Sequence, residues 1–261
     1  MPYADALREA QQRGYAEANP AMDVDGSDAA QKLAILAHLA FGARVHWSEI
    51  PRVGIDHLDT ADLRYAEELG YRIRLLATAK LLEEGRLELH VSPSLVKIGR
   101  PLAEVRDAYN AVSVVGDAVG RVFFHGLGAG QMPTASAVVA DMIDTAVGRI
   151  AITFRSLELW SERESPVHLA EYGETVSRFY LRLTVKDRPG VLAEITGILG
   201  RQKISIASVI QHEPDEDGPP DEVPLIIMTH QASEQAGRDA LAEISKLPSV
   251  RSQNVRMRVI D

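Results

Sequence analysis

The spacing of apolar positions changes along the chain, and this change divides it into predicted helices and strands. Over the first 70 residues, apolar side chains recur three and four positions apart, which is the spacing of a helix that buries one face. Gly14, Gly42 and Gly70 follow three such stretches, and glycine is favoured where a helix ends. The predicted helices are residues 4–13, 27–41 and 61–69, the last of them capped by Thr60.

The second of these helices carries the widest apolar stripe. A stripe of this kind marks the face that a helix buries. Its members are Leu33, Ile35, Leu36, Leu39 and Ala40.

Beyond residue 70 the period shortens to two, which is the spacing of strands. The pair Glu84-Gly85 separates two alternating stretches and predicts a hairpin. Two further alternating stretches predict another hairpin, and a helical pattern follows them. The predicted strands are residues 71–80, 87–96, 111–117 and 120–126, and the helix covers roughly 132–150 with a pattern that extends toward 160.

A polar stretch, residues 160–174, is the predicted linker between a first domain, 1–159, and a tail domain, 175–261. The tail alternates as βαββαβ, which is typical of the ferredoxin-like fold, so the chain is expected to be α+β. An exposed edge of this sheet would suit pairing with another copy. The predicted tail strands are 178–186, 204–212, 223–230 and 250–259, the helices are 190–201 and 233–246, and an acidic loop covers 213–222.

Composition restricts the classes of function. The 261 residues carry a formal net charge of −9 with no basic cluster, so nucleic acid is not an expected partner. The absence of cysteine excludes disulfides, thiolate metal sites and a cysteine nucleophile. No apolar run is long enough to cross a membrane, and the first residues lack the apolar core of a signal peptide. We therefore expect a cytoplasmic protein that has no membrane partner.

The stretch DVDGSDAAQK, from Asp23 to Lys32, places three carboxylates ahead of one lysine. One interpretation is helix capping, because Asp side chains accept hydrogen bonds from first-turn N–H groups and favour the positive end of the helix dipole. Asp28 and Lys32 are four residues apart, so they can also pair on one helix face.

Two other interpretations compete with capping. A calcium loop would need glycine at its sixth position and glutamate at its twelfth, where this chain has Asp28 and Ala34. A polar catalytic site would gather Glu17 and Asp23 near Lys32. A lysine among carboxylates can bind a hydroxyl, shuttle a proton or anchor a substrate ammonium through its partner acids. The residues alone do not choose among these roles.

The same stretch lies in a segment that resembles the signature of homoserine dehydrogenases. In that family A-x-x-x-G-Y-A-E-x-x-P precedes D-x-x-G-x-D-A-A-x-K-L, and this chain has ALREAQQRGYAEANPAMDVDGSDAAQKL. The later GLGAGQMPTASAVVADM is similar to the family's glycine-rich segment, and LGYRIRLLATAK and PLAEVRDAYNAVSVVGD also resemble the family. The resemblance covers most of residues 4–145 and implies a mixed sheet covered by helices.

This resemblance implies the NAD(P)-dependent interconversion of L-homoserine and L-aspartate 4-semialdehyde, a step toward threonine and methionine. Glu17 would bind the amino group of homoserine, and Asp23 and Asp28 would line the pocket, with Asp23 directed toward the substrate. Lys32 would be the catalytic lysine that handles the proton of the alcohol or aldehyde, with Asp23 beside it.

The segment FFHGLGAGQMPTAS predicts a strand, a glycine turn and a helix. Gly126, Gly128 and Gly130 permit close backbone approach and positive φ, and the new helix start offers N–H donors. Spacing alone favours a tight structural turn, because the pattern is not G-x-G-x-x-G and no acidic residue follows at the required distance. The resemblance implies instead that Gly128, Ala129 and Gly130 lie beside the nicotinamide half of NADP or NAD.

The family's dinucleotide fingerprint, second catalytic lysine and sodium-binding segment are not found in this sequence. We therefore expect the main cofactor-binding domain to lie outside this chain, and the isolated chain to have little or no dehydrogenase activity. Apolar surface that faces that domain would then be exposed and would favour self-association.

The tail segment YLRLTVKDRPGVLAEITGILGRQKISIASVIQ resembles the ACT domain, an amino-acid-sensing module. Pro189-Gly190 turns strand into helix, and the first helical N–H groups suit a carboxylate. The implied effector is threonine, bound near Asp187, Pro189, Gly190 and Val191. ACT domains commonly pair, so a dimer or tetramer is expected, and a domain that only dimerises is the structural alternative.

An alternative for the whole chain is a non-catalytic protein that senses threonine, dimerises and associates with a catalytic partner. Binding of NADP(H) would separate this alternative from a partial enzyme. A purely structural role makes another prediction, which is that Lys32→Ala in a completed enzyme leaves turnover intact.

Overall fold

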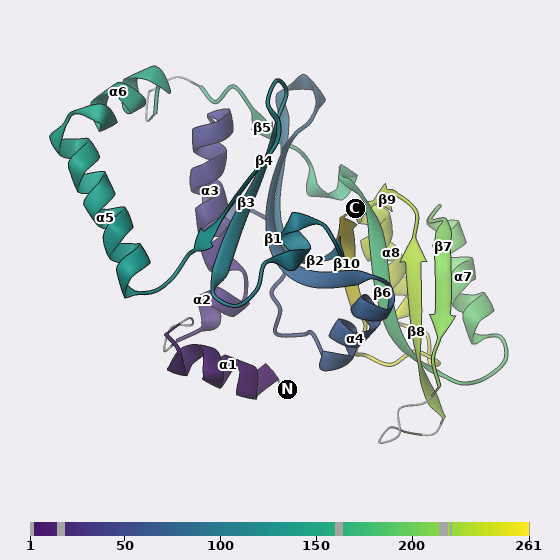
Figure 1. Cartoon of the computed structure of the whole chain (residues 1–261). Coiled ribbons are helices and arrows are strands. Elements are labelled where there is room, and N and C mark those ends of the chain that lie inside the picture. Colours follow the sequence, from purple (N-terminus) through teal and green to yellow (C-terminus); the bar gives the residue numbers. More distant parts are fainter. Residues whose placement is uncertain (1–2, 15–18, 160–163, 214–218, 220, 261) are drawn as a thin grey trace.

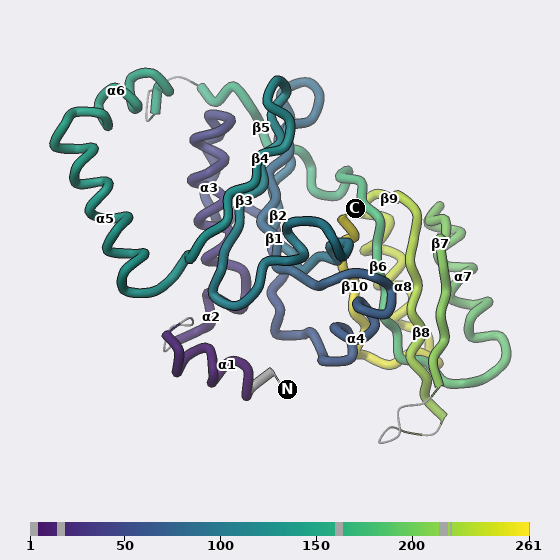
Figure 2. The backbone as a smooth tube through the Cα atoms, viewed as in Figure 1, coloured from purple at the N-terminus to yellow at the C-terminus, as the bar shows by residue number. Residues whose placement is uncertain are grey.

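The computed structural model describes residues 3–14, 19–159, 164–213, 219 and 221–260 (Figures 1 and 2). The N-terminal part contains α1 (Tyr3–Gln12), α2 (Ala21–Val24), α3 (Ser27–Phe41), α4 (Thr60–Glu68), β1 (Tyr71–Leu81), β2 (Arg86–Lys97), β3 (Tyr109–Gly116), β4 (Gly120–Leu127), α5 (Gln131–Ala146) and α6 (Arg149–Ser156). The C-terminal part contains β5 (His168–Leu169), β6 (Val176–Lys186), α7 (Val191–Arg201), β7 (Ile206–Gln211), β8 (Glu222–Thr229), β9 (Ala232–Ser233), α8 (Glu234–Ile244) and β10 (Val255–Ile260).

One mixed sheet runs through both parts of the molecule. Its order is β1-β2-β10-β6-β8-β7, with β5 added to β2 and β9 added to β6. The four strands β10-β6-β8-β7 pair antiparallel, which is the ferredoxin-like arrangement that the βαββαβ pattern predicted. Strand β10 also pairs in parallel with β2, so one edge of the tail sheet is covered by the N-terminal part.

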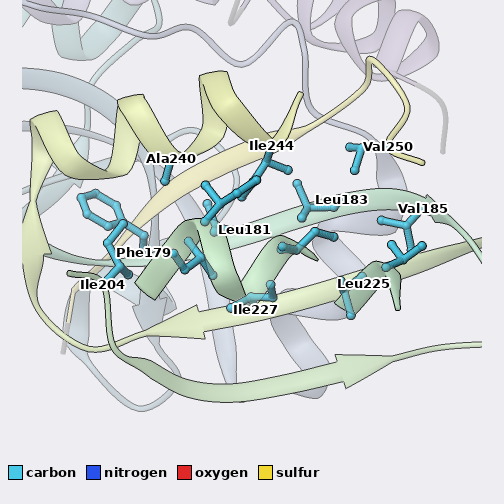
Figure 3. Close-up of a cluster of buried hydrophobic side chains, with 14 of the residues drawn as sticks. Phe179, Leu181, Leu183, Val185, Ile204, Leu225, Ile227, Ala240, Ile244 and Val250 are labelled. Carbon is cyan, nitrogen blue, oxygen red and sulfur yellow. The ribbon is translucent and has the colours of Figure 1, made fainter. Parts of the chain in front are cut away.

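Helices cover this sheet on both faces because the strand side chains alternate. Helices α7 and α8 lie over the face that carries Phe179, Leu181 and Leu183, and together they form the largest apolar cluster (Figure 3). Helix α4 covers the opposite face through Tyr65 and Ala66. Helix α3 lies over β1 and β2, where a third cluster is buried.

The remaining N-terminal elements form what we call the arm, which is the β3–β4 hairpin together with α5 and α6. The hairpin is a separate two-stranded sheet. Figure 1 shows α5 and α6 projecting from the body of the molecule on the side opposite α7 and α8. Neither arm helix contains a buried residue.

Three sequence-based expectations about helices were wrong in detail. Helix α4 is capped by Asp59, which accepts a hydrogen bond from the Ala61 amide at 2.9 Å, so Thr60 is the first helical residue rather than the cap. The long helix predicted over 132–150 breaks at Gly148, whose φ of +78° is left-handed.

The third error concerns the apolar stripe of α3. The helix packs on β2 through a narrow face made by Ala30, Leu33 and Ala37, and small residues there allow close approach. Ile35, Leu36 and Leu39 lie on the exposed side. Their periodicity correctly predicted the helix but not which face is buried.

No helix of the described residues is both long and apolar enough to span a bilayer.

Candidate functional site

The start of α3 is shaped by two glycines that admit close backbone contacts. Gly26 has a φ of +82°, and a Cβ there would lie 3.2 Å from Cγ1 of Val91 on β2. Gly54 passes so close to α2 that a Cβ would lie 2.5 Å from the Val24 carbonyl oxygen. The turn between α2 and α3 therefore packs against β2 at Gly26 and against the segment around Gly54.

Asp25 bears only partly on the capping interpretation, because the N-cap residue of α3 is Gly26 and no side chain caps it. Its Oδ1 accepts a hydrogen bond from the Ser27 amide at 2.7 Å, in the turn just before α3. Hydrogen bonds from the side chain and the backbone of Ser27 hold the pKa of Asp25 below its usual value. One of the three carboxylates in the stretch is thus used to begin the helix.

Asp28 and Lys32 form the chemically distinctive pair of this region. The Lys32 Nζ donates to Asp28 Oδ2 at 2.7 Å. The Lys32 side chain is 68% exposed and the Asp28 side chain is 42% exposed. An ammonium that is held by a carboxylate and still open to solvent can donate a hydrogen bond or a proton to an incoming oxygen. Asp23 lies on α2, in the turn that precedes this pair, and its side chain is exposed.

The structure brings together only part of the predicted substrate site. Asp28 and Lys32 are in direct contact, and Asp23 belongs to the adjoining short helix. Glu17 lies outside the described residues. No three His, Asp or Glu side chains within the described ranges gather in a way that could hold a metal ion.

The glycine-rich segment between β4 and α5 is a tight turn with one demanding contact. A Cβ on Gly128 would lie 2.1 Å from Nδ2 of Asn110, so the Asn110 amide occupies the space that any other residue would need. Gly130 precedes α5 with a φ of +115°. Gly126 has neither a positive φ nor a close neighbour, so the expectation that all three glycines serve such roles was wrong for this one.

This segment leaves the first turn of α5 free of acidic side chains. Ala129 and Gly130 present backbone at the helix start, and the exposed loop can approach a flat polar group closely.

The turn predicted to bind an effector joins β6 to α7. Gly190 is left-handed, with a φ of +95°, and its carbonyl accepts from the Glu194 amide at 3.0 Å. Val191 is buried in the large apolar cluster, which anchors the helix start. Asp187 accepts a hydrogen bond from Nε2 of Gln211 on β7 at 3.2 Å, and Pro189 is exposed.

A cavity of about 720 Å³ lies elsewhere, between the second half of α3 and α6. Its lining includes Ile35, Leu39 and Phe154, so it is mainly apolar. Lys32 and Asp28 are not among its lining residues, so the Asp28–Lys32 pair does not open into this space.

Sequence reasoning missed a set of buried charges where the two parts of the molecule meet. Glu88 on β2 contacts Arg258 on β10, and Asp62 on α4 contacts Arg182 on β6. The available signal was weak, because Glu88 and Arg258 simply looked like polar residues that alternate along half-exposed strands.

Comparison with known proteins gives two family matches. The homoserine dehydrogenase family matches residues 1–143, and the ACT domain family matches residues 179–248. The homoserine dehydrogenase of Pseudomonas aeruginosa is 42% identical over 98% of this chain, and that of Neisseria gonorrhoeae is 39% identical over 95%. These alignments cover 59% and 57% of the two relatives, so the chain spans about three-fifths of their length.

Solved structures agree with the sequence comparison. A homoserine dehydrogenase from Thiobacillus denitrificans superimposes on the whole chain with a TM-score of 0.84 at 39% identity, and the match covers 59% of that protein. The Staphylococcus aureus homoserine dehydrogenase at pH 7.5 gives a TM-score of 0.67 at 27% identity, with 58% of that protein covered. The chain therefore belongs to the homoserine dehydrogenase family and carries an ACT domain in its C-terminal part.

Proposed function

We propose that this chain is the substrate-binding and regulatory portion of a homoserine dehydrogenase, which interconverts L-homoserine and L-aspartate 4-semialdehyde. The observation that carries the proposal is the exposed Asp28–Lys32 pair on the first turns of α3. Asp25 alone stabilises the turn before α3, whereas the solvent-facing Asp28–Lys32 pair adds a proton donor beside an acid.

Lys32 is the group that exchanges a proton with the substrate oxygen. When the alcohol is oxidised, the neutral amine of Lys32 accepts the hydroxyl proton, and when the aldehyde is reduced, the Lys32 ammonium donates a proton to the oxygen. Asp28 orients the Lys32 side chain, Asp23 faces the substrate, and Glu17 binds the substrate's amino group. The nicotinamide cofactor, NAD or NADP, supplies the hydride chemistry when it is bound.

We propose the glycine turn as the place where the cofactor's nicotinamide end meets this chain. Gly128 leaves room for the Asn110 amide, and Ala129 and Gly130 offer bare backbone at the start of α5. The dinucleotide fingerprint is not present in the 261 residues, so we infer that a further domain supplies most of the cofactor contacts and that this chain alone turns over little homoserine.

The proposed division of the chain follows the expected boundaries. Residues 1–159 form the substrate portion, 160–174 the linker and 175–261 the ACT portion. Support comes from β6, which begins at Val176 and is the first long strand of the tail. We also propose that the chain assembles as a dimer or tetramer.

The catalytic part of the proposal is tested in a fusion. The N-terminal region of the Pseudomonas aeruginosa relative that lies outside the match is joined to this chain, and homoserine oxidation is followed by NADPH or NADH formation. Lys32→Ala is expected to lower kcat by roughly 10²–10⁴-fold, the usual loss for a positioned acid or base. Lys97→Ala, at the exposed end of β2, is the matched control and should leave kcat unchanged. Normal turnover in the Lys32→Ala fusion would contradict the assignment.

A second candidate function is amino-acid sensing without catalysis. The ACT family match and the Gly190 turn at the start of α7 support a site for a small amino acid, and we propose threonine. Calorimetric titration of the 261-residue chain with threonine, and separately with NADPH and homoserine, distinguishes the candidates. Micromolar NADPH binding would contradict the inference that the main cofactor domain lies elsewhere, whereas threonine binding alone would favour the sensing role.

A further inference from the structure

A cluster of buried charges links the ACT portion to the central strand of the substrate portion. The guanidinium of Arg258 on β10 donates to Oε1 of Glu88 on β2 at 2.8 Å and to Oγ1 of Thr175 at 3.0 Å. It also lies 3.1 Å from Oε2 of Glu234 at the start of α8. Arg256 contacts the other carboxylate oxygen of Glu234.

These charged groups are deeply buried. Glu88, Glu234 and Arg258 are each more than nine-tenths buried. Removing charges from water is costly, and the cost is offset only while every partner stays in place. Arg258 hydrogen-bonds to Glu88 and Thr175 and is ion-paired with Glu234, so β2, β10 and the start of α8 can shift relative to one another only by breaking these contacts.

The opposite face of β2 supports the helix that carries Lys32. Side chains on a strand alternate between its two faces, so Leu87, Leu89 and Val91 point away from Glu88. These three residues belong to the apolar cluster beneath α3. Strand β2 therefore carries Glu88 of the buried charge cluster on one face and the apolar side chains that pack against α3 on the other.

Val91 is the point at which β2 reaches the beginning of α3. Its amide donates to the Pro51 carbonyl, and its carbonyl accepts from the Val53 amide, both at 2.9 Å. Its Cγ1 packs against Gly26, where a Cβ would come within 3.2 Å. A displacement of β2 at residues 88–91 would therefore be passed to the turn that begins α3.

We propose that Arg258 is a positioning residue that fixes the start of α3, and with it the Asp28–Lys32 pair, by holding β2 through Glu88. The ACT portion is then a structural part of the substrate site as well as a place for an effector. The importance of the Asp28–Lys32 pair for the reaction rests on the function proposed above, but the mechanical link from Arg258 to α3 does not.

The molecule contains a natural comparison for this link. Arg182 on β6 makes a bidentate pair with Asp62 on α4, at 2.5 and 2.9 Å, and it is also buried between the two parts. That pair reaches α4 and not α3. If Arg258 acts through β2, loss of the two arginines must loosen different segments.

Amide hydrogen exchange of the 261-residue chain, resolved by NMR, tests the proposal without any assay of turnover. In Arg258→Met we expect exchange of the Val91, Val53, Ser27 and Ala30 amides to accelerate at least tenfold over wild type. Amides in α7 should accelerate less than threefold. Uniform acceleration of all slow amides, or no change at α3, would overturn the proposal, because either result shows no specific link.

Two control variants make this result specific. Arg201→Met removes an exposed ion pair with Glu243 inside the ACT portion and should leave α3 unchanged. Arg182→Met lowers overall stability, so its effect is read relative to the acceleration of the α7 amides, and on that scale α4 should accelerate more than Ser27 and Ala30. Acceleration at Ser27 and Ala30 above that of α7 in either control would contradict the proposed route.

A milder variant covers the case in which Arg258→Met does not fold. Glu88→Gln keeps the size of the side chain but weakens the contact with Arg258, and it should give the same pattern of exchange at a lower amplitude. Wild-type exchange at Val91 and Ser27 in a folded Glu88→Gln chain would overturn the proposal. Wild-type kcat in the Lys32→Ala fusion would overturn the proposed function and leave the link from Arg258 to α3 intact.

Discussion

The helices of the ACT portion and those of the arm have similar apolar content, but they differ in how many of their residues are buried. Helices α7 and α8 each bury four residues against the sheet. Helices α5 and α6, with 16 and 8 residues, bury none. In the arm, large side chains such as Met142, Ile143 and Phe124 are at least half exposed.

This difference shows that an apolar pattern predicts a helix more reliably than it predicts what covers the helix. In the ACT portion the covering sheet is formed by the same 85 or so residues, so the local sequence completes its own core. The arm has no such sheet among the described residues. Its exposed apolar side chains are of the kind that, where they are contiguous, mark an interaction surface.

The largest expected effect is a difference in stability between loss of a buried ion pair of the ACT portion and loss of an exposed ion pair of the arm. Arg182→Met leaves Asp62, which has no exposed surface, as a buried unpaired charge. We expect the free energy of unfolding to fall by about 3–5 kcal/mol. In the arm, Arg149→Met breaks an exposed pair with Asp144 and should cost less than about 1 kcal/mol. Urea denaturation of both variants measures the difference, and equal losses would contradict it.

The next effect compares two isoleucines in helices. Ile195 of α7 is fully buried, whereas Ile152 of α6 is 67% exposed. Ile195→Ala should lower the free energy of unfolding by about 2–5 kcal/mol, because it removes buried methyl groups and leaves a cavity. Ile152→Ala should change it by less than about 0.5 kcal/mol. A large loss from Ile152→Ala would show that the arm is covered in solution, for example by self-association, and sedimentation at two concentrations would identify that case.

The ACT portion was the more predictable region because its determinants are local. The four long strands of its βαββαβ pattern were predicted, although β10 begins five residues later than expected, and only the two-residue β9 was missed because it is too short to show a pattern. The bounds of α3 were also predicted, since Gly42 at its end adopts the left-handed conformation that glycine favours. At Asp59-Thr60, two good capping residues stood side by side, and their order along the chain could not show which one caps the helix.

The contacts between the two parts could not be predicted from sequence. Glu88 and Arg258 are 170 residues apart, and no local pattern indicates that a tail strand would pair with β2. The Asp28–Lys32 pair was visible because it spans one helical turn. Its relation to Glu17 depends on a segment outside the described residues, so that part of the candidate site remains a prediction.

A smaller effect is expected at the helix starts of the two regions. In the ACT portion the Ser233 hydroxyl accepts a hydrogen bond from the Ala236 amide at 3.2 Å and caps α8. Ser233→Ala should cost about 1 kcal/mol. The arm helix α6 starts at Gly148 without a side-chain cap, so Gly148→Asn, which tolerates the left-handed conformation, should change stability by only a few tenths of a kcal/mol. Thermal unfolding of the two variants decides this, and a large loss from Gly148→Asn would show that the arm start is tightly packed.

The smallest expected effect comes from a proton, because no packing contact is removed. His90 is buried beside the Glu88–Arg258 pair, and burial lowers the pKa of His90 although the nearby Glu88 carboxylate opposes this. The unfolded chain takes up a proton near pH 6.5, whereas the folded chain does so only at lower pH. The free energy of unfolding should therefore decrease as the pH falls from about 6.5 toward the lower pKa of the folded state, and His90 should contribute no slope above that window.

Urea denaturation at several values between pH 5 and 8 measures this slope, and His90→Gln supplies the control because it cannot titrate. The nearby His90 ring and the hydrogen bond from Arg258 keep the pKa of Glu88 below its usual value despite burial, so Glu88 protonates below the pH range of this experiment. The arm offers the matched comparison in His125, which stacks on Tyr109 in the exposed hairpin. If His125→Gln removed the slope and His90→Gln did not, the proton-sensitive region would be the arm, and the buried charges beneath β2 would stabilise the fold without responding to pH.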